Sequence, residues 1–471
     1  MHMKKNTLAR FVLLLAPLVS LLASASLRSV AAETSDSLTQ DRALEARKTN
    51  LQSEYYRLIS IQPAAARKCR DEYAALVNQT PAQAPFFSYV LGAQWLGGLP
   101  AEQELAPFLK GKAPLPEACR IMGELGSDII KIAPGSKQLK DQGFDVTGYE
   151  TLDKAIRHPH FKRILDLPYR VMLFWAHGSS GSSSKPMSEQ QKADLHREFF
   201  ELTKYLLTQY NDTGKTFLIG NWEGDWMAGA KSVGNDKDLD EARIRAFQEW
   251  LDVRTSAIDK AKAMTPHWNV AVYSYLEINL VNRARTKRVK RLVNTVLPLS
   301  HVDYVSVSSY ETQGYGVWED PKSEAALHAR AFDNLNYIES NLPPRDIPGK
   351  RVFIGEIGFT LEEIQKKQQL TREQADKEQA RLALVQAKVD LEWGTPLWLW
   401  WAIFNSREGS FSLVNQLTGQ KSALYDELKI YYQWADDYVK GYKQAHGTLP
   451  DQATFRRQAL EQLSKQISRL S

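Results

Sequence analysis

Two glutamates follow short apolar runs and could carry out chemistry together. Glu356 ends the run that starts at Val352, and Glu223 comes shortly after the run 215–220. Short β-branched runs bounded by glycine predict buried strands, and a carboxylate at such a strand end is costly unless it is paired or faces a pocket. Two carboxyl groups at one pocket can cleave a glycosidic bond. One donates a proton to the leaving oxygen, and the other attacks the anomeric carbon or activates water.

Further polar and aromatic residues follow the other apolar runs. Sugars present hydroxyl groups to polar side chains and C–H faces to aromatic rings, so this combination predicts a carbohydrate ligand. No group of residues has metal-ligand spacing, and neither a metal nor an organic cofactor is expected. The residues at the predicted strand ends are His177, Asn221, Trp222, Asp225, Tyr275, Glu277, Tyr310, Glu311, Trp398, Trp400 and Trp401.

The elements that must position these residues alternate between strand and helix. This alternation predicts parallel strands, and eight of them with long connections fit an α/β (β/α)8 TIM barrel, whose active site lies at the carboxyl ends of the strands. The alternative is an open doubly wound sheet, but no Gly-rich phosphate fingerprint or Walker motif is present. The predicted strands are 86–92, 128–132, 169–176, 215–220, 268–275, 303–310, 351–356 and 396–404.

Counting strands gives Glu223 and Glu356 their places, on the fourth and the seventh. Here the chain resembles clan A glycoside hydrolases, which are retaining (β/α)8-barrel enzymes. The run Phe353-Ile354-Gly355-Glu356-Ile357-Gly358 looks like the apolar-Gly-Glu-x-Gly pattern of that clan. The resemblance covers roughly residues 86–440. It implies that Glu356 is the nucleophile and Glu223 the acid/base.

The same resemblance implies roles for other strand-end residues. Asn221 would lie near the 2-hydroxyl of the reacting sugar, and Tyr310 would hydrogen-bond the nucleophile. Trp401 would form the floor of the cleavage subsite, and Trp400 is the neighbouring candidate because adjacent strand residues face opposite ways. The chain departs from the clan in having Trp222 between Asn221 and Glu223, and Lys131 where an arginine is often found on the second strand.

Structural roles are the alternatives for most of these side chains. Glu356 could pair with Lys131, and Glu223 could be an acid of a surface loop. Asp225 competes with Glu223 as proton donor, and His177 could be an ordinary loop histidine. The tryptophans of the eighth strand could pack against the last helix. Glu277 and Glu311 are expected at the rim or at helix starts.

The 471 residues suffice for one large barrel with additions. Residues 1–32 have a basic start, an apolar stretch and a small-residue end, which predicts a cleaved secretory signal rather than a membrane anchor. We expect a helical extension over 33–82, the barrel over 83–445, with a flexible Ser-rich loop at 179–184, and a helical tail over 446–471.

Removal of the signal also changes the charge of the chain. The net charge of +5 includes four basic and no acidic residues in 1–32, so 5 − 4 leaves +1. This value gives no support for nucleic-acid binding. No further segment is apolar enough to cross a membrane, so a secreted or periplasmic protein is expected. Export would permit a disulfide between Cys69 and Cys119, and unpaired buried thiols are the alternative.

The sequence therefore predicts an exported retaining glycoside hydrolase that acts on a polysaccharide or oligosaccharide. Protein partners are not predicted. Two other functions keep the same barrel. One is a catalytically inactive glycan-binding protein of an envelope or polysaccharide-export assembly, and the other is a transglycosylase.

Overall fold

A computed structural model of the chain describes residues 89–95, 102–112, 114–232, 236–313, 324–404 and 411–471, with isolated positions between 43 and 72. The chain divides into two compact units, Met1–Gln79 and Thr80–Ser471. The predicted signal and most of the predicted N-terminal extension lie outside the described residues. The predicted domain boundaries stay a prediction.

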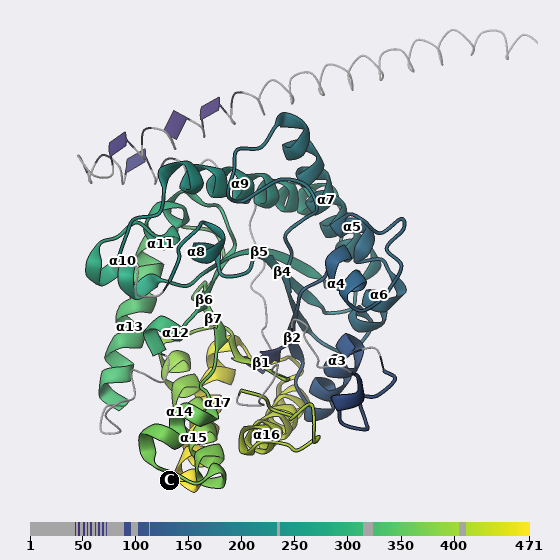
Figure 1. Cartoon of the computed structure of the whole chain (residues 1–471), viewed down its shortest axis with the longest axis vertical. Helices are drawn as coiled ribbons and strands as arrows, with labels where there is room; N and C mark the ends of the chain where they lie inside the picture. The colour runs from purple at the N-terminus through teal and green to yellow at the C-terminus, as the bar shows by residue number, and fades with distance from the viewer. Residues whose placement is uncertain are drawn as a thin grey trace, which may run out of the picture. The chain divides into compact units, whose positions relative to one another are not determined.

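Eight parallel strands of the second unit form a closed barrel in sequence order, which confirms the predicted α/β (β/α)8 fold. Helices surround the strands (Figure 1). The last strand pairs with the first, Leu91 opposite Trp398 and Gln94 opposite Trp401. The strands are β1 (Leu91–Gln94), β2 (Ile129–Ile132), β3 (Val171–Trp175), β4 (Thr216–Gly220), β5 (Ala271–Ile278), β6 (Tyr304–Ser308), β7 (Val352–Ile357) and β8 (Trp398–Trp401).

The longest helices between the strands begin with strong caps. Ser188 and Thr371 each accept a hydrogen bond from the backbone of a glutamine three residues later, whose side chain accepts one in return. The helices are α3 (Pro114–Leu125), α4 (Ser136–Asp141), α5 (Leu152–Ala155), α6 (Pro159–Leu165), α7 (Glu189–Gln209), α8 (Gly224–Met227), α9 (Glu241–Met264), α10 (Val281–Lys287), α11 (Leu292–Thr295), α12 (Tyr310–Gln313), α13 (Glu324–Asn341), α14 (Leu361–Gln368), α15 (Arg372–Trp393), α16 (Ala423–His446) and α17 (Gln452–Leu470), with short 3-10 turns at Glu102–Glu104 and Leu297–Leu299.

Inward-facing side chains fill the barrel, because alternate residues of each strand point to its interior. The buried cluster takes Leu173 and Trp175 from β3, Tyr273 and Tyr275 from β5, and Phe353 from β7. The next inward residues toward the carboxyl ends belong to the site described below. The apolar core thus supports the polar layer from beneath.

Two strands differ from the prediction in a way that matters for the site. β1 lies at Leu91–Gln94 and not at 86–92, so Gln94 belongs to the barrel. β5 extends to Ile278, three residues beyond its predicted end. Glu277 is therefore a strand residue that faces the barrel interior. The prediction that it lies at the rim or starts a helix was wrong.

The C-terminal segment is a helix that packs on the barrel unit. Gln466 of α17 donates a hydrogen bond to the Glu427 carboxylate of α16 at 2.7 Å. Arg456 donates one to the Gly394 carbonyl, which follows α15. Within the described part of the chain, no helix is long and apolar enough to span a membrane.

Candidate active site

An irregularity at the end of β7 places Glu356 at the centre of the barrel mouth. The pairing of β7 with β6 skips Gly355, since Val307 lies opposite Ile354 and Ser308 lies opposite Glu356. A side chain at Gly355 would collide with the Ser306 hydroxyl. The glycine therefore permits the close approach that turns Glu356 inward.

One described hydrogen bond reaches the Glu356 carboxylate. Tyr310, at the start of α12, donates its hydroxyl to Oε1 at 2.9 Å, as the family resemblance implied. Oε2 is buried and has no hydrogen-bond partner among the described residues. Glu356 is 5% exposed. One carboxylate oxygen is thus held in place while the other is left for a ligand.

Glu277 is the most heavily hydrogen-bonded carboxylate of the site. Its Oε2 pairs with the Lys131 ammonium at 2.6 Å and accepts from Trp175 Nε1 at 3.2 Å. Ser306 and Ser308 donate to its two oxygens. Both charged groups are fully buried. The alternative that Lys131 pairs with Glu356 was wrong, because its partner is Glu277.

Lys131 also fixes the backbone beside Glu356. Its ammonium donates to the Gly355 carbonyl at 3.0 Å. Gln94 of β1 donates to the same carbonyl at 3.2 Å. Side chains of β1 and β2, neither of which pairs with β7, therefore hold the peptide that carries Glu356.

Glu223 precedes α8 and lies within electrostatic reach of Glu356. Its backbone N–H donates to Glu277 Oε1 at 3.2 Å, so the Lys131–Glu277 pair also holds this segment. Burial, followed by repulsion from Glu277, raises the pKa of Glu223 to about 7. A carboxyl group with such a pKa can donate and accept a proton near neutral pH.

Burial raises the pKa of Glu356 as well, and Glu277 and Glu223 add repulsion, while Lys131 and the Tyr310 hydrogen bond favour the ionised form. A proton on Glu223 removes its share of that repulsion. The two carboxyl groups then hold one proton between them more readily than none. The hydrogen bond from Tyr310 favours the distribution in which Glu356 is ionised and Glu223 holds this proton.

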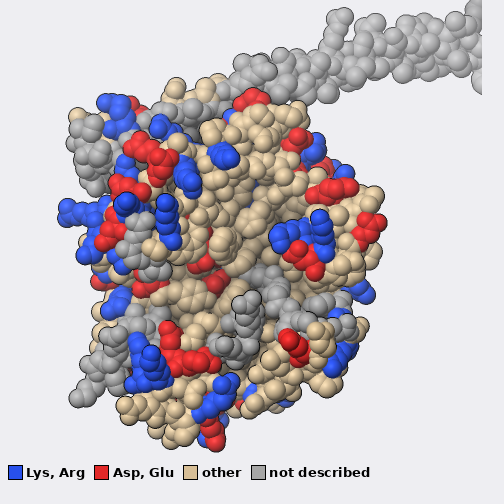
Figure 2. Space-filling model, viewed as in Figure 1, with Lys and Arg blue, Asp and Glu red and all other residues tan. Residues whose placement is uncertain are grey.

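Aromatic rings form one side of the site. Trp401 at the end of β8 stacks on Trp175 with ring centroids 6.3 Å apart and planes at 27°. Trp400 faces away from the barrel and donates its indole N–H to the Phe411 carbonyl at 2.9 Å. Of the two candidates left open by the sequence, Trp401 is the one on the site side. Figure 2 shows a hollow at the centre of this face, with acidic side chains inside it.

Two other predicted ligand contacts, Asn221 and Asp225, have buried hydrogen-bond partners within the protein. Asn221 binds the backbone of Glu277, donating to its carbonyl at 3.1 Å and accepting from its N–H at 3.2 Å. The Asp225 carboxylate accepts from the backbone N–H groups of Asn279 and Leu292. These two residues brace the β4 and β5 ends, and their predicted sugar contacts stay predictions.

Tyr275 lies one layer below the site. It is 1% exposed and donates its hydroxyl to the Phe174 carbonyl at 3.1 Å. Its ring also occupies the space that a side chain at Gly220 would need. In the structure it packs the barrel core, and Glu277 takes the place at the mouth that the predicted strand end gave to Tyr275.

The remaining predicted residues lie at the edge of the mouth or outside it. Trp222 is 40% exposed. The His177 ring stacks on Trp250. Glu311 accepts from the first backbone N–H groups of α10, which confirms its predicted place at a helix start.

The predicted disulfide joins cysteines in different units. Cys69 belongs to the first unit and Cys119 to the second, and both are free in the structure. Burial raises the pKa of the Cys119 thiol, which keeps it protonated. The bridge stays a prediction.

Sequence reasoning missed Trp175 as a member of the site, and it named Glu277 at a strand end but placed it at the rim or at a helix start. Both follow the inward alternation of their strands, since Leu173 and Tyr275 point into the barrel. Extending β5 by one inward position would have found Glu277. Its pairing with Lys131 joins residues 146 positions apart, and no local pattern announces it.

No protein-family model and no curated protein matches the chain. Among solved structures it is similar to a family 5 xyloglucanase from Paenibacillus pabuli, with 12% identity, a TM-score of 0.46, and coverage of 74% of this chain and 99% of that one. It is also similar to a GH5 cellulase affiliated with Bacteroidetes, with 17% identity, a TM-score of 0.45, and coverage of 74% of this chain and 91% of that one. A third similar structure is an exo-β-1,4-mannosidase from Opitutaceae bacterium strain TAV5, with 11% identity, a TM-score of 0.44 and coverage of 76% of this chain. The chain spans 60% of the length of that mannosidase.

Proposed function

We propose that the protein is an exported retaining glycoside hydrolase that cleaves a polysaccharide or oligosaccharide with Glu356 and Glu223. The observation that carries the proposal is the difference in hydrogen bonding between the carboxylates of the site. Glu277 has all its partners within the protein, whereas Glu356 keeps one buried oxygen without a described partner beside a carboxyl group of pKa about 7.

The proposed reaction has two steps. In the first, Glu356 Oε2 attacks the anomeric carbon, and Glu223 gives its proton to the leaving glycosidic oxygen. In the second, Glu223 takes a proton from water, which displaces Glu356 and restores both groups. Tyr310 holds the attacking carboxylate, and the stacked Trp175 and Trp401 offer a ring surface to the sugar.

The test is a panel of aryl glycosides and of bacterial and plant polysaccharides, given to the wild type and to Glu356→Gln. Hydrolysis by the wild type alone, with the product first released in the substrate's anomeric configuration by NMR, supports the proposal. Equal turnover by both proteins contradicts the role of Glu356. Inverted product contradicts the retaining mechanism.

Other outcomes of the same panel would favour the two alternative functions. Binding without turnover across the panel favours an inactive glycan-binding barrel. Transfer to added sugar acceptors in preference to water favours a transglycosylase. Export is tested separately, by fractionating cells that produce the full chain and sequencing the N-terminus of the mature protein.

A further inference from the structure

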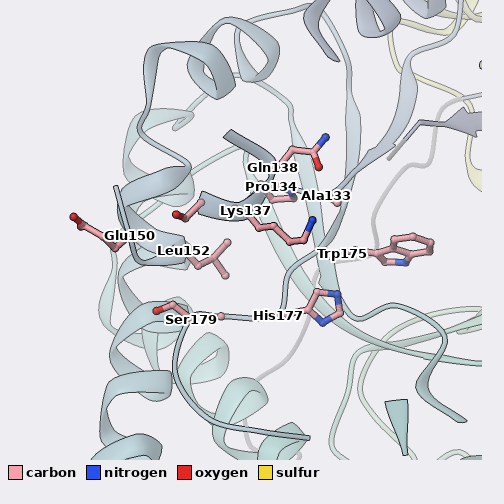
Figure 3. Close-up of a pocket in the computed structure, with 12 residues that line it drawn as sticks. Ala133, Pro134, Lys137, Gln138, Glu150, Leu152, Trp175, His177 and Ser179 are labelled. Carbon is pink, nitrogen blue, oxygen red and sulfur yellow. The ribbon is translucent and has the colours of Figure 1, made fainter. Parts of the chain in front are cut away.

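A pocket lies beside the site, at the carboxyl ends of β2 and β3. It has a volume of about 390 Å³ and opens between the β2–α4 turn, the start of α5 and the β3–α7 loop. Figure 3 shows the side chains of these three segments around it. A volume of this size falls in the range of small-ligand pockets. The residues used below include Ser136, Gln138, Leu152, Trp175 and Ser179, all of which line it.

One buried carboxylate ties two walls of this pocket together. Glu198 of α7 accepts hydrogen bonds from the backbone N–H groups of Leu152 at 3.0 Å, Ser179 at 2.8 Å and Ser180 at 3.0 Å, and from the Ser179 hydroxyl at 2.7 Å. Glu198 is fully buried. The Ser-rich loop was predicted to be flexible, but hydrogen bonds to Glu198 fix its first residues, Ser179 and Ser180. The pocket is formed before any ligand arrives.

Trp175 connects the pocket with the site. Its ring lines the pocket, stacks on Trp401 and donates to Glu277. A ligand in the pocket would therefore lie across one indole ring from the carboxylates. This position suits a part of the substrate that extends from the centre of the barrel mouth toward the edge of the barrel.

The lining is suited to an uncharged sugar. Trp175 and Leu152 offer apolar surface, and Ser136, Gln138 and Ser179 offer hydroxyl or amide groups. The lining contains one basic residue, Lys137, and one acidic residue, Glu150. Lys137 forms an ion pair with Asp141 of its own helix. Neither sign of charge dominates, so neither an acidic nor a basic group is favoured over a neutral one.

We propose that this pocket binds one uncharged sugar unit of the substrate beside the unit that is cleaved. The unit is either a branch on the glycan or the end of its chain. The statement that this sugar unit belongs to a substrate rests on the proposed function. Binding of a sugar in the pocket can nevertheless be measured without turnover.

The binding test uses full-length Glu356→Gln, which holds a ligand without cleaving it. Glucose, galactose, mannose and xylose are titrated by saturation-transfer NMR, with glucuronate as the charged comparison. The added substitution Gln138→Trp fills the pocket from α4, and Lys140→Trp puts the same ring on the exposed side of that helix. At least one neutral sugar should bind tenfold more weakly to Gln138→Trp than to Lys140→Trp. Equal binding, or preference for glucuronate, overturns the proposal.

The turnover test separates the two sources of the sugar unit. The same two substitutions are made in the active protein, and kcat/KM is compared on linear, singly branched and aryl substrates. Gln138→Trp should lower the ratio of kcat/KM for the branched or longer substrate to that for the aryl glycoside at least tenfold, while Lys140→Trp keeps it. Loss confined to branched substrates identifies a branch, and equal loss on linear ones identifies the chain end. An unchanged ratio contradicts the proposal.

The failures of the two proposals are distinguishable. If the wild type cleaves nothing in the panel but the neutral sugar still binds differently to the two α4 variants, the proposed function fails and the pocket stands. If Gln138→Trp does not fold, Ser136→Phe with the same control takes its place. Circular dichroism and urea unfolding check folding for every variant.

Discussion

Glu277 and Glu356 are two carboxylates of one barrel mouth with opposite surroundings. Glu277 faces a buried lysine, an indole and two hydroxyl groups, whereas Glu356 has one described hydrogen bond. Both are buried, so burial does not separate structural from reactive acids. The useful measure is the number of lone pairs that the protein leaves free, because a group with all partners in place has nothing to offer a ligand.

The first way to break this comparison is to replace each carboxylate by its amide. Glu356→Gln should lower kcat/KM by at least about 10⁴-fold with little loss of stability, since it removes the attacking group but no paired charge. Glu277→Gln should lower the free energy of unfolding by about 3–5 kcal/mol, because Lys131 stays buried without its partner. Urea unfolding and initial rates measure both.

Two further variants sharpen this test. Glu461→Gln, at an exposed position on α17, controls for the substitution itself. Lys131→Met combined with Glu277→Gln should recover part of the lost stability, because it removes both charges. A stable, active Glu277→Gln and an unstable Glu356→Gln would reverse the assignment.

Glu223 and Asp225 extend the comparison to the two proton-donor candidates. Glu223→Gln should lower kcat about 10²–10⁴-fold for glycosides with poor leaving groups and much less for activated aryl glycosides, since only the former need the proton. Asp225→Asn should destabilise the fold by about 1–3 kcal/mol and leave the dependence on leaving group as it is. A Brønsted series of aryl glycosides checks this, and a steeper dependence in Asp225→Asn instead would exchange the roles.

Tyr310 tests how the one described hydrogen bond to Glu356 contributes. The hydrogen bond favours ionised Glu356 and lowers its pKa. Tyr310→Phe should therefore raise that pKa, move the acidic limb of the kcat/KM profile to higher pH, and reduce activity by about 10–100-fold at pH 6, in line with about 1.5–3 kcal/mol for a bond to a charged group. An acidic limb that does not move would separate Tyr310 from the ionisation of Glu356.

Glu223 also affects the pH dependence of stability. The folded-state pKa of Glu223, about 7, lies above its unfolded value of about 4.3, so the folded protein binds that proton more tightly. The resulting stability is fully present below about pH 4 and is lost as the pH rises through about 7. Glu223→Gln should match the wild type at pH 4 and exceed it by on the order of 3 kcal/mol at pH 8, because each unit by which the pKa is raised corresponds to about 1.4 kcal/mol. Unfolding curves that stay parallel at all pH values would contradict this.

The sequence was sufficient for the fold and for the positions of several site residues. Strand counting placed Glu356 on β7 and Glu223 after β4, and the family resemblance implied the hydrogen bond from Tyr310, which the structure contains. These inferences succeed because strand ends carry strong local signals, namely apolar runs, glycines and turns.

The parts that failed depend on strand length and on distant pairs. Ending β5 at Tyr275 moved Glu277 into a loop, and a shift of two residues along an inward-facing strand changes the layer of the barrel that a side chain reaches. The Lys131–Glu277 pair spans the barrel interior and joins residues 146 positions apart in the chain. A local sequence pattern does not predict contacts between residues so far apart in the chain. Asn221 and Asp225 were placed correctly on the chain, but their backbone partners belong to β5 and α11.

The pairing of β1 with β8 joins residues more than 300 positions apart in the chain. A ring of strands has no closed interior until its last member docks, and such a distant contact is slow to form because the loop entropy must be lost first. Gln94 from the first strand and Trp401 from the last both belong to the site. We therefore expect the appearance of activity during refolding to report docking of the last strand.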